Sequence, residues 1–224
     1  MSTLGVIILG GGGHARVVHS VLRLTCARVL GFTDPAPETS GQIARELPHL
    51  GTDEALRDFD PNEVELVNGL GSTSNTDLRA RVFQSACERG FRFRVLRHPS
   101  AIVADDVDLG PGVQLMAGAI VQTGTRVGAN TLVNTGAIID HDCVIEDHVH
   151  VAPGAVLSGQ VIIGERVHIG VGATIRQGIR VGSRAVVGAG AAVVNEVGAG
   201  CTVVGVPARP KQATRSASHG VRGS

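Results

Sequence analysis

Hydrophobic residues recur at every sixth position through the second half of the chain, and this repeat dominates the sequence pattern. The series runs unbroken from Val103 to Val193, and each member is Val, Leu or Ile. A small or apolar residue stands two places before many members, and Gly, Asn or Asp often stands three places after. A six-residue period is typical of a parallel β-helix, in which each short strand points a branched side chain inward before the chain turns a corner. We therefore predict a β-helix of hexapeptide repeats over about residues 101–194.

The same repeat predicts which residues are neighbours. With three strands per coil, residues eighteen apart should lie above one another on one side of the prism. Gly159 follows His141 by this interval, so we expect the two in adjacent coils. The outward positions vary in chemistry, whereas a purely architectural rod usually repeats one outward residue. Variable exteriors favour a scaffold that carries functional sites.

The first part of the chain follows a different pattern, in which short apolar strands alternate with helical segments. We expect strands at residues 6–9, 28–32, 65–68 and 91–96, and helices at residues 15–24 and 76–89. This alternation is typical of a small α/β domain. The predicted fold is an N-terminal Rossmann-like βαβ domain, residues 1–98, followed by a β-helix, residues 99–212, and a small polar tail, residues 213–224, expected to be disordered.

Composition narrows the possible partners. Twenty Lys and Arg balance 20 Asp and Glu, so no global field attracts nucleic acid or an anionic membrane. Only 2% of residues are aromatic, which argues against stacking platforms for single-stranded nucleic acid. The four cysteines form no CxxC pair, so no metal site is expected. With no basic n-region before residues 5–9 and no apolar run of the ~20 residues that span a bilayer, we expect a soluble, cytoplasmic protein.

A glycine-rich turn lies between the first strand and the first helix. Gly10, Gly12 and Ala15 satisfy G-x-G-x-x-G/A, and Asp34 follows about 20 residues later at the end of the second strand. Taken alone, this motif indicates NAD. Glycine N–H groups and a helix N-terminus bind phosphate generally, however, and an acid can receive a ribose hydroxyl or a base N–H. A nucleotide-linked sugar fits as well, and the domain is too short for a full six-stranded dinucleotide fold.

Three motifs together resemble those of a known family. Residues 10–18 read GGGGHARVV, residues 140–145 read DHDCVI within the hexapeptide series, and residues 205–209 read GVPAR. Over about residues 5–211 the chain resembles the bacterial sugar acetyltransferases of the sialic-acid O-acetyltransferase type, which include enzymes that N-acetylate UDP- and GDP-linked 4-amino-4,6-dideoxy sugars. The resemblance implies a left-handed β-helix, a homotrimer with active sites between subunits, and acetyl-CoA as donor. Periodicity alone gives neither the hand nor the trimer.

The repeat region contains the candidates for acid–base chemistry, which are His141, His148, His150 and His168. Acetyl transfer from a thioester to an amine needs a base, and histidine titrates near neutrality. His141 is flanked by Asp140 and Asp142, and a carboxylate on its second ring nitrogen would fix the tautomer. The alternative is that His141 is a solvated corner residue. For His148 and His168 we expect exposed polar positions without a role.

The resemblance assigns further roles. It makes His141 the general base and Asp142 its acidic partner; His150 would contact the acetyl-CoA thioester, and the Gly159 N–H would face the acetyl oxygen. Coenzyme A would run between neighbouring β-helices along Val171, Gly172, Gly188, Ala189 and Gly190, although the turns need glycine anyway. In the family, the N-terminal domain holds the sugar nucleotide, and the expected substrate-binding residues here are Gly12, Gly13, His14, Asp34, Pro35 and Gly71.

The leading hypothesis is an acetyl-CoA-dependent N-acetyltransferase of polysaccharide biosynthesis, acting on the C4 amino group of a nucleotide-linked 4-amino-4,6-dideoxyhexose. GDP-perosamine is the first guess, but the choice between GDP and UDP depends on the loops at residues 34–38 and 70–75, which the sequence does not place. One alternative is O-acetylation of a sugar such as a sialic acid. Another, from a different class, is a CoA-binding or nucleotide-sugar-binding module without catalytic activity.

Overall fold

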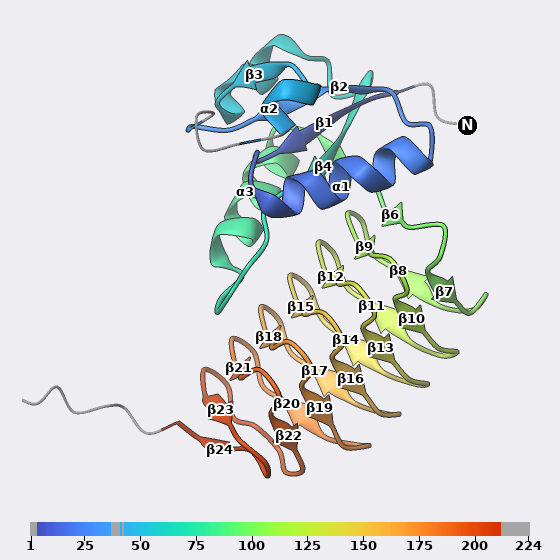
Figure 1. Ribbon diagram of the computed structural model, residues 1–224, viewed down its shortest axis with the longest axis vertical. Helices are drawn as coiled ribbons and strands as arrows, with labels where there is room; N and C mark the ends of the chain where they lie inside the picture. Colours follow the sequence, from blue (N-terminus) through green and yellow to red (C-terminus); the bar gives the residue numbers. More distant parts are fainter. Residues whose placement is uncertain (1–3, 37–40, 42, 212–224) are drawn as a thin grey trace, which may run out of the picture.

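An α/β sheet domain lies on the end of a coil of short strands in the computed structural model, which describes residues 4–36, 41 and 43–211 (Figure 1). The expected tail at residues 213–224 and part of the loop at residues 34–38 lie outside the described residues. None of the helices in the described ranges has the length and apolar character needed to cross a bilayer.

The N-terminal sheet is parallel, with the strand order β3-β2-β1-β4-β5. Its strands are β1 (Gly5–Leu9), β2 (Val29–Thr33), β3 (His49–Gly51), β4 (Val64–Asn68) and β5 (Arg92–Phe93). The central strand β1 is buried along its whole length, as its continuous apolar run requires. Helix α1 (Gly13–Leu24) packs on the face that carries Val6 and Ile8, and helix α3 (Asp77–Glu88) packs on the opposite face.

Two sequence expectations for this domain need correction. The segment between Asp34 and residue 65, for which no helix or strand was expected, forms α2 (Ile43–Glu46), β3 and the 3-10 helix η2 (Asp53–Asp58), which are too short to give a periodic pattern. The strand expected at residues 91–96 is wrong as a single element. Its first part is β5, whereas β6 (Leu96–Arg97) pairs with a strand of the coil. The chain thus passes directly from one sheet into the other.

Three sheets form the sides of the coil. Sheet 1 contains β6, β9 (Gln114–Leu115), β12 (Leu132–Val133), β15 (His150–Val151), β18 (His168–Ile169), β21 (Val186–Val187), β23 (Thr202–Val204) and the antiparallel β24 (Arg209–Pro210). Sheet 2 contains β7 (Ile102–Val103), β10 (Ile120–Val121), β13 (Ile138–Ile139), β16 (Val156–Leu157), β19 (Thr174–Ile175) and β22 (Ala192–Val193). Sheet 3 contains β8 (Asp108–Leu109), β11 (Arg126–Val127), β14 (Val144–Ile145), β17 (Ile162–Ile163) and β20 (Arg180–Val181).

The six-residue series forms the core of the coil. Every member from Leu115 to Val193 is at most 2% exposed. Ile139 pairs with Leu157 in the next coil, which confirms the eighteen-residue stacking. Corner residues adopt positive φ, and several of them are not glycine, namely Asn130, Asp142, His148, Gln160, Arg166 and Arg184. Non-glycine residues seldom take this conformation, so the tight corners are imposed by the coil rather than by local preference.

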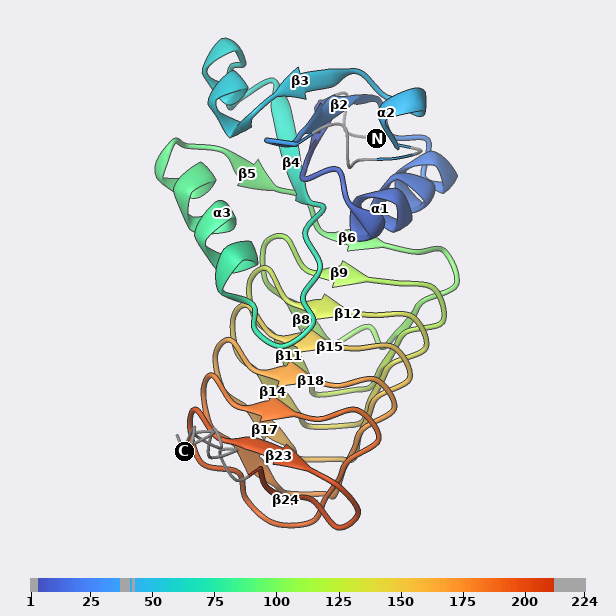
Figure 2. The same cartoon turned by 60° about the vertical axis from the view of Figure 1, so that its left-hand side comes forward.

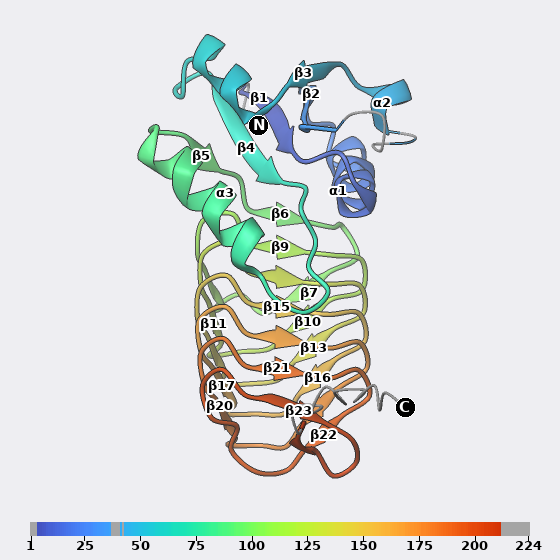
Figure 3. The same ribbon diagram turned by 90° about the vertical axis from the view of Figure 1, so that its left-hand side faces the viewer.

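The N-terminal domain contacts the coil along one side, over several coils. Helix α3 runs along the corner between sheets 3 and 1, and the loop at residues 69–76 descends across sheet 1 (Figures 2 and 3). Phe83 of α3 packs edge-to-face against His148, with ring centroids 5.5 Å apart. Further down, Asp77 pairs with Arg184 at 3.0 Å. Side chains of the first domain therefore cover part of the coil surface.

Candidate active site

The N-terminus of α1 is open to a ligand. Gly12 is the N-cap residue of this helix, and no described side chain accepts a hydrogen bond from its first turn. A Cβ added at Gly12 or Gly13 would have no atom of the described residues within 4 Å. Asp34 closes the turn, because its Oδ2 accepts from the Gly11 N–H at 2.6 Å and its Oδ1 from the Ala36 N–H at 2.8 Å. The backbone N–H groups of this first turn, which no described side chain caps, and the helix dipole favour an anion here.

A cavity of about 610 Å³ lies between this helix start and the coil. The N-terminal domain contributes Gly13, His14, Gly71, Ser72 and Thr73. The coil contributes Asn134, His150, Ala152, Pro153, His168, Gly170, Val171, Val186, Val187, Gly188 and Ala189. The cavity therefore joins three features that are far apart in the sequence: the glycine-rich turn, the loop after β4, and the corners between sheets 1 and 2.

A hydrogen-bonded group of side chains lines the coil side of the cavity. Ser72 Oγ lies 2.6 Å from His150 Nδ1 and 3.2 Å from His168 Nδ1. Asn134 Nδ2 lies 3.1 Å from His150 Nε2. The two imidazole rings meet edge to face, with centroids 5.0 Å apart. Ser72 thereby ties the loop after β4 to the wall of the coil.

Burial keeps the histidines of the cavity neutral. Desolvation, followed by the charges of His168 and Arg79, lowers the pKa of His150 to about 3. Desolvation and then Arg79 lower the pKa of His14 to about 4, despite its 2.8 Å hydrogen bond to Gln114. Burial also lowers the pKa of His168. Near pH 7 each ring therefore has one donor and one acceptor nitrogen.

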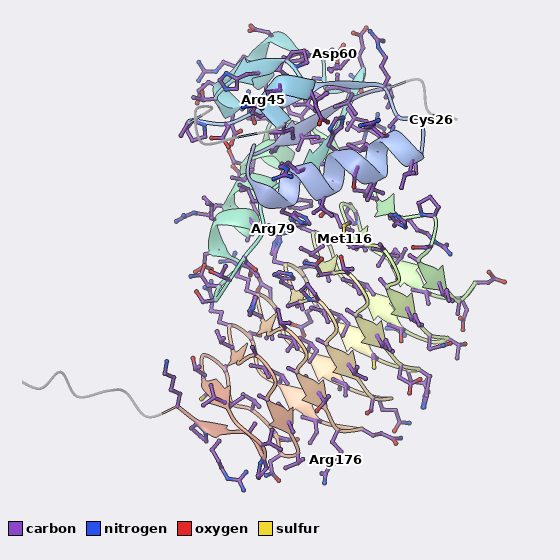
Figure 4. The ribbon with its side chains drawn as sticks, in the orientation of Figure 1. Cys26, Arg45, Asp60, Arg79, Met116 and Arg176 are labelled. Carbon is purple, nitrogen blue, oxygen red and sulfur yellow. The ribbon has the colours of Figure 1, made fainter. Side chains whose placement is uncertain are left out.

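A buried cation connects the two domains beside the cavity. Arg79 of α3 is 1% exposed, and burial lowers its pKa to about 9. Its guanidinium donates to the carbonyls of Leu70 at 2.7 Å, Asn68 at 3.2 Å and Asn130 at 3.2 Å. None of its hydrogen bonds within the described ranges goes to a carboxylate. Figure 4 shows Arg79 at the junction of α3 and the coil. The hydrogen bond to the Leu70 carbonyl holds the loop after β4 there.

The expectation of exposed positions for His148 and His168 is wrong. They are 4% and 5% exposed, respectively, because α3 and the loop after β4 cover their side of the coil. His148 receives a hydrogen bond at 3.0 Å from the Asn130 amide and packs on Phe83, so it belongs to the junction between the domains. Sequence reasoning also missed Asn134, Gln114 and Arg79, and it placed Ser72 in the loop around the nucleotide without its contact to the coil. The eighteen-residue spacing of His150 and His168 was the available signal.

His141 lies at the corner between β13 and β14 and does not line the cavity. Its Nδ1 is 2.8 Å from Asp142 Oδ2, while the Asp140 carboxylate accepts the backbone N–H of His141 at 2.8 Å. Of the two flanking acids, Asp142 is thus the one that pairs with the ring. The hydrogen bond to Asp142, with smaller contributions from both carboxylate charges, raises the pKa of His141.

Gly159 lies under the His141 ring in the next coil. A Cβ at this glycine would be only 2.5 Å from His141 Nε2. The Gln160 N–H donates to the His141 carbonyl at 2.9 Å, which fixes the two corners together. The neighbour relation predicted from the eighteen-residue spacing is confirmed. His141 Nε2 and the Gly159 backbone consequently share one small surface.

The expected coenzyme positions fall into two groups. Val171, Gly188 and Ala189 line the cavity, and the Val171 side chain is exposed. Gly172 and Gly190 follow at the corners with φ of +63° and +65°, so the turns alone account for glycine there. Arg209 lies in β24, which pairs with β23, and the Lys211 N–H donates to the Thr202 carbonyl at 2.7 Å.

The predicted site residues as a whole are not all brought together. Seven of them line the cavity, namely Gly13, His14, Gly71, His150, Val171, Gly188 and Ala189. Asp34 and the exposed Pro35 follow the carboxyl end of β2. His141, Asp142 and Gly159 lie at the corner between sheets 2 and 3. A single chain therefore presents the candidate base and the cavity on different parts of its coil.

Family models match both parts of the chain. The PglD N-terminal domain matches residues 5–86, a bacterial transferase hexapeptide (six repeats) matches residues 124–159, and a hexapeptide repeat of succinyl-transferase matches residues 160–194. Perosamine N-acetyltransferase from Caulobacter crescentus, a mutant solved with CoA and GDP-perosamine, is 34% identical, with a TM-score of 0.87 over 95% of this chain and 99% of that chain. The chain belongs to the hexapeptide-repeat acyltransferases.

Two further structures resemble this acyltransferase over nearly its whole length. The acetyltransferase domain of PglB from Neisseria gonorrhoeae, solved with acetyl coenzyme A, is 35% identical, with a TM-score of 0.87 over 94% of this chain and 100% of that chain. WeeI from Acinetobacter baumannii is 26% identical, with a TM-score of 0.84 and coverage of 93% and 100%. Comparison with curated protein sequences gives no match. The predicted fold, a Rossmann-like domain followed by a left-handed parallel β-helix, is confirmed.

We predict that Gly159→Ala will inactivate this acyltransferase without unfolding it. The new Cβ would occupy the place of His141 Nε2, but the ring is 42% exposed and can move toward solvent. If the candidate base His141 is displaced, we expect a loss of about 100-fold in kcat with little change in melting temperature. The matched control is Gly198→Ala, where the nearest atom to the Cβ is at 3.4 Å and activity should persist. Full activity of Gly159→Ala would show that the position of this ring does not matter.

Proposed function

We propose that this acyltransferase transfers the acetyl group of acetyl-CoA to the C4 amino group of a nucleotide-linked 4-amino-4,6-dideoxyhexose. The observation that carries the proposal is the cavity between the open N-terminus of α1 and the histidine-lined wall of the coil. Relatives at 34% and 35% identity bind GDP-perosamine with CoA and acetyl coenzyme A, respectively. GDP-perosamine is therefore the first acceptor to test.

The two sides of the cavity suit the two substrates. The start of α1 offers unpaired N–H groups to a diphosphate. Across the cavity, Ala152, Pro153 and Val171 offer apolar surface to a pantetheine arm. A volume of about 610 Å³ is within the range of small-molecule sites. The arrangement supports a ternary complex in which the sugar amine and the thioester approach each other directly.

In the proposed reaction His141 is the general base. The neutral amine attacks the thioester carbonyl, and His141 Nε2 takes the proton from nitrogen as the C–N bond forms. The Asp142 carboxylate on Nδ1 stabilises the imidazolium. The Gly159 N–H, which has no hydrogen-bond partner in the described part of the chain, is available to the oxyanion. Collapse breaks the C–S bond, and the CoA thiolate takes the proton from the imidazolium.

We further propose that the active site is completed by a homotrimer, since one chain does not bring His141 to the cavity. The support is an apolar stripe on the outward face of sheet 2, formed by Ile102, Ile120, Ile138 and Val156. Ile102 is 61% exposed. Such a stripe is typical of a subunit interface, and it adjoins the corner that carries His141. A neighbouring subunit packed there would place its cavity beside this histidine.

Ile138→Glu should dissociate the assembly. Its side chain points away from the coil, so a carboxylate there would leave the fold intact but be buried unpaired in the interface. We expect monomers by light scattering and a loss of about 100-fold or more in activity, because the base and the cavity would separate. The control is Ile162→Glu, an outward residue of sheet 3 at the same level of exposure. A trimeric, active Ile138→Glu would place the interface elsewhere.

Asp142→Asn should shift the pH profile toward acid. Only neutral His141 accepts a proton, so activity is lost as pH falls through its pKa, which the Asp142 hydrogen bond raises. Without the carboxylate the pKa falls, and the acid limb of kcat moves to lower pH while the plateau drops about tenfold or more. The same amine substrate is used throughout, so its own titration cancels. Asp140→Asn should shift the limb less, and equal shifts would contradict the pairing.

The proposed function is tested by thiol release from acetyl-CoA against a panel of GDP-, UDP- and dTDP-linked 4-amino sugars. Rapid release with one amino sugar, and none with its 4-hydroxyl analogue, is the expected result. Release with the hydroxyl sugar instead would support O-acetylation. Tight acetyl-CoA binding with no thiol released on any acceptor would support a non-catalytic binding module and refute the proposal.

A further inference from the structure

The orientation of one amide determines where the protons lie in the cavity. The Asn134 Oδ1 accepts the backbone N–H of Thr135 at 2.8 Å, so the amide nitrogen must face His150. His150 Nε2 then accepts from this nitrogen. A neutral imidazole carries one proton, and that of His150 therefore lies on Nδ1.

The proton of His150 fixes that of its neighbour through Ser72. His150 Nδ1–H donates to Ser72 Oγ at 2.6 Å, and the Ser72 hydroxyl has one proton of its own to donate. Its other partner is His168 Nδ1 at 3.2 Å, which must accept. His168 therefore carries its proton on Nε2. Burial lowers the pKa of both rings, which agrees with these neutral forms.

The Nε2–H of His168 is left without an acceptor. No described residue accepts from it, although the residue is only 5% exposed and lines the cavity. The strands on either side of β18 present His150, already paired, and Val186, which has no acceptor in its side chain. The residue lines the cavity, so an acceptor atom of a ligand can reach this free N–H there.

We propose that His168 binds the donor substrate, with its Nε2–H donating to a carbonyl oxygen of the acyl-pantetheine arm, and that Ser72 is the positioning residue that sets its tautomer. The identity of the ligand rests on the function proposed above. His168 lies on the coil wall with Pro153 and Val171, not at the start of α1 where an anion is favoured. A neutral N–H matches a neutral carbonyl. Ser72 belongs to the loop after β4. The N-terminal domain therefore orients a residue of the coil that binds acetyl-CoA.

The first test compares His168→Phe with His168→Gln. Phe removes the donor, whereas the amide of Gln can place an N–H close to the position of Nε2. We expect His168→Phe to raise KM for acetyl-CoA about 5- to 10-fold and leave KM for the nucleotide sugar unchanged, with most of the loss restored in His168→Gln. A rise confined to KM for the sugar would overturn the assignment, as would equal effects of Phe and Gln.

Calorimetry with acetyl-CoA in the absence of acceptor separates this inference from the proposed function. Weaker binding by His168→Phe is expected. Unchanged binding would overturn the role of His168 alone, whereas failure of the wild-type protein to bind acetyl-CoA would refute the proposed function.

The tautomers are read from ¹⁵N-histidine NMR, which should show Nδ1–H for His150 and Nε2–H for His168. In Ser72→Ala the His168 ring should no longer be held in the Nε2–H tautomer alone. An Nδ1–H tautomer of His168 in the wild-type protein would contradict the proposed hydrogen-bond arrangement.

Discussion

His141→Asn is expected to lower kcat about 100- to 10,000-fold while the fold and the assembly stay intact. The imidazole is partly exposed at a corner, its backbone N–H bonds to Asp140, and its carbonyl accepts from Gln160, so the corner does not depend on the ring. The ring nitrogen over Gly159 is the atom that takes the proton in the proposed transfer. Asparagine cannot accept a proton near neutrality, and therefore kcat should fall much more than KM changes. Steady-state kinetics with both substrates measure the effect.

A second histidine provides the control for this prediction. His98 is half-buried at the start of the coil, and its side chain hydrogen-bonds only to Ser100 within the described residues, so His98→Asn should retain activity. Light scattering should give the same assembly for both variants and the wild-type protein. If His141→Asn turned over at the wild-type rate, the proton would have to leave by another route and the general-base role would be lost.

Arg79→Met is expected to destabilise the protein by about 3 kcal/mol, or roughly 6–12 °C in melting temperature. Methionine fills a similar volume but leaves the carbonyls of Asn68, Leu70 and Asn130 without their donor. These acceptors lie at a junction from which water is excluded, since Arg79 is 1% exposed. The loop after β4 would lose its attachment, and activity should fall with stability. Thermal unfolding and kinetics of the same preparations measure both.

Neighbouring and conservative variants sharpen this prediction. Arg81 is an exposed residue of the same helix, so Arg81→Met should change neither property. Arg79→Lys should recover little, because one ammonium group cannot reach three carbonyls as the guanidinium fork does. A melting temperature for Arg79→Met equal to that of the wild-type protein would mean that the cost of burying the charge already cancels its hydrogen bonds.

The periodic features of this protein could be predicted because a Val, Leu or Ile stands at every sixth position of the coil. The inward series from Leu115 to Val193 and the stacking of His141 on Gly159 both follow from a fixed interval. The strand expected at residues 91–96 failed for the opposite reason. Both of its halves are apolar strands, and only tertiary pairing decides that Phe93 joins one sheet and Leu96 another.

The hydrogen bonds that line the cavity could not be predicted in full, because Ser72 meets His150 and His168 across the two domains. Ser72 lies in a loop and Asn134 after a short strand, and neither position has a periodic signal. His168 was assigned to the surface because an isolated coil would expose it, and the loop that buries it lies nearly a hundred residues earlier. Arg79 was likewise unremarked, since a cation within a helical pattern usually faces solvent.

The passage from β5 into β6 without a linker bears on how this enzyme can be re-engineered. Acceptor specificity invites exchange of residues 1–98 between relatives, as if that segment were a module. The segment ends inside the first coil, however, and its loop supplies Ser72 to the coil wall while α3 supplies Arg79. A chimaera joined at this boundary would inherit mismatched partners at both contacts. A productive exchange between relatives has to transfer residues 1–98 together with their partners in the coil, namely Asn130, Asn134, His150 and His168. The segment to exchange is therefore the whole junction between the two domains.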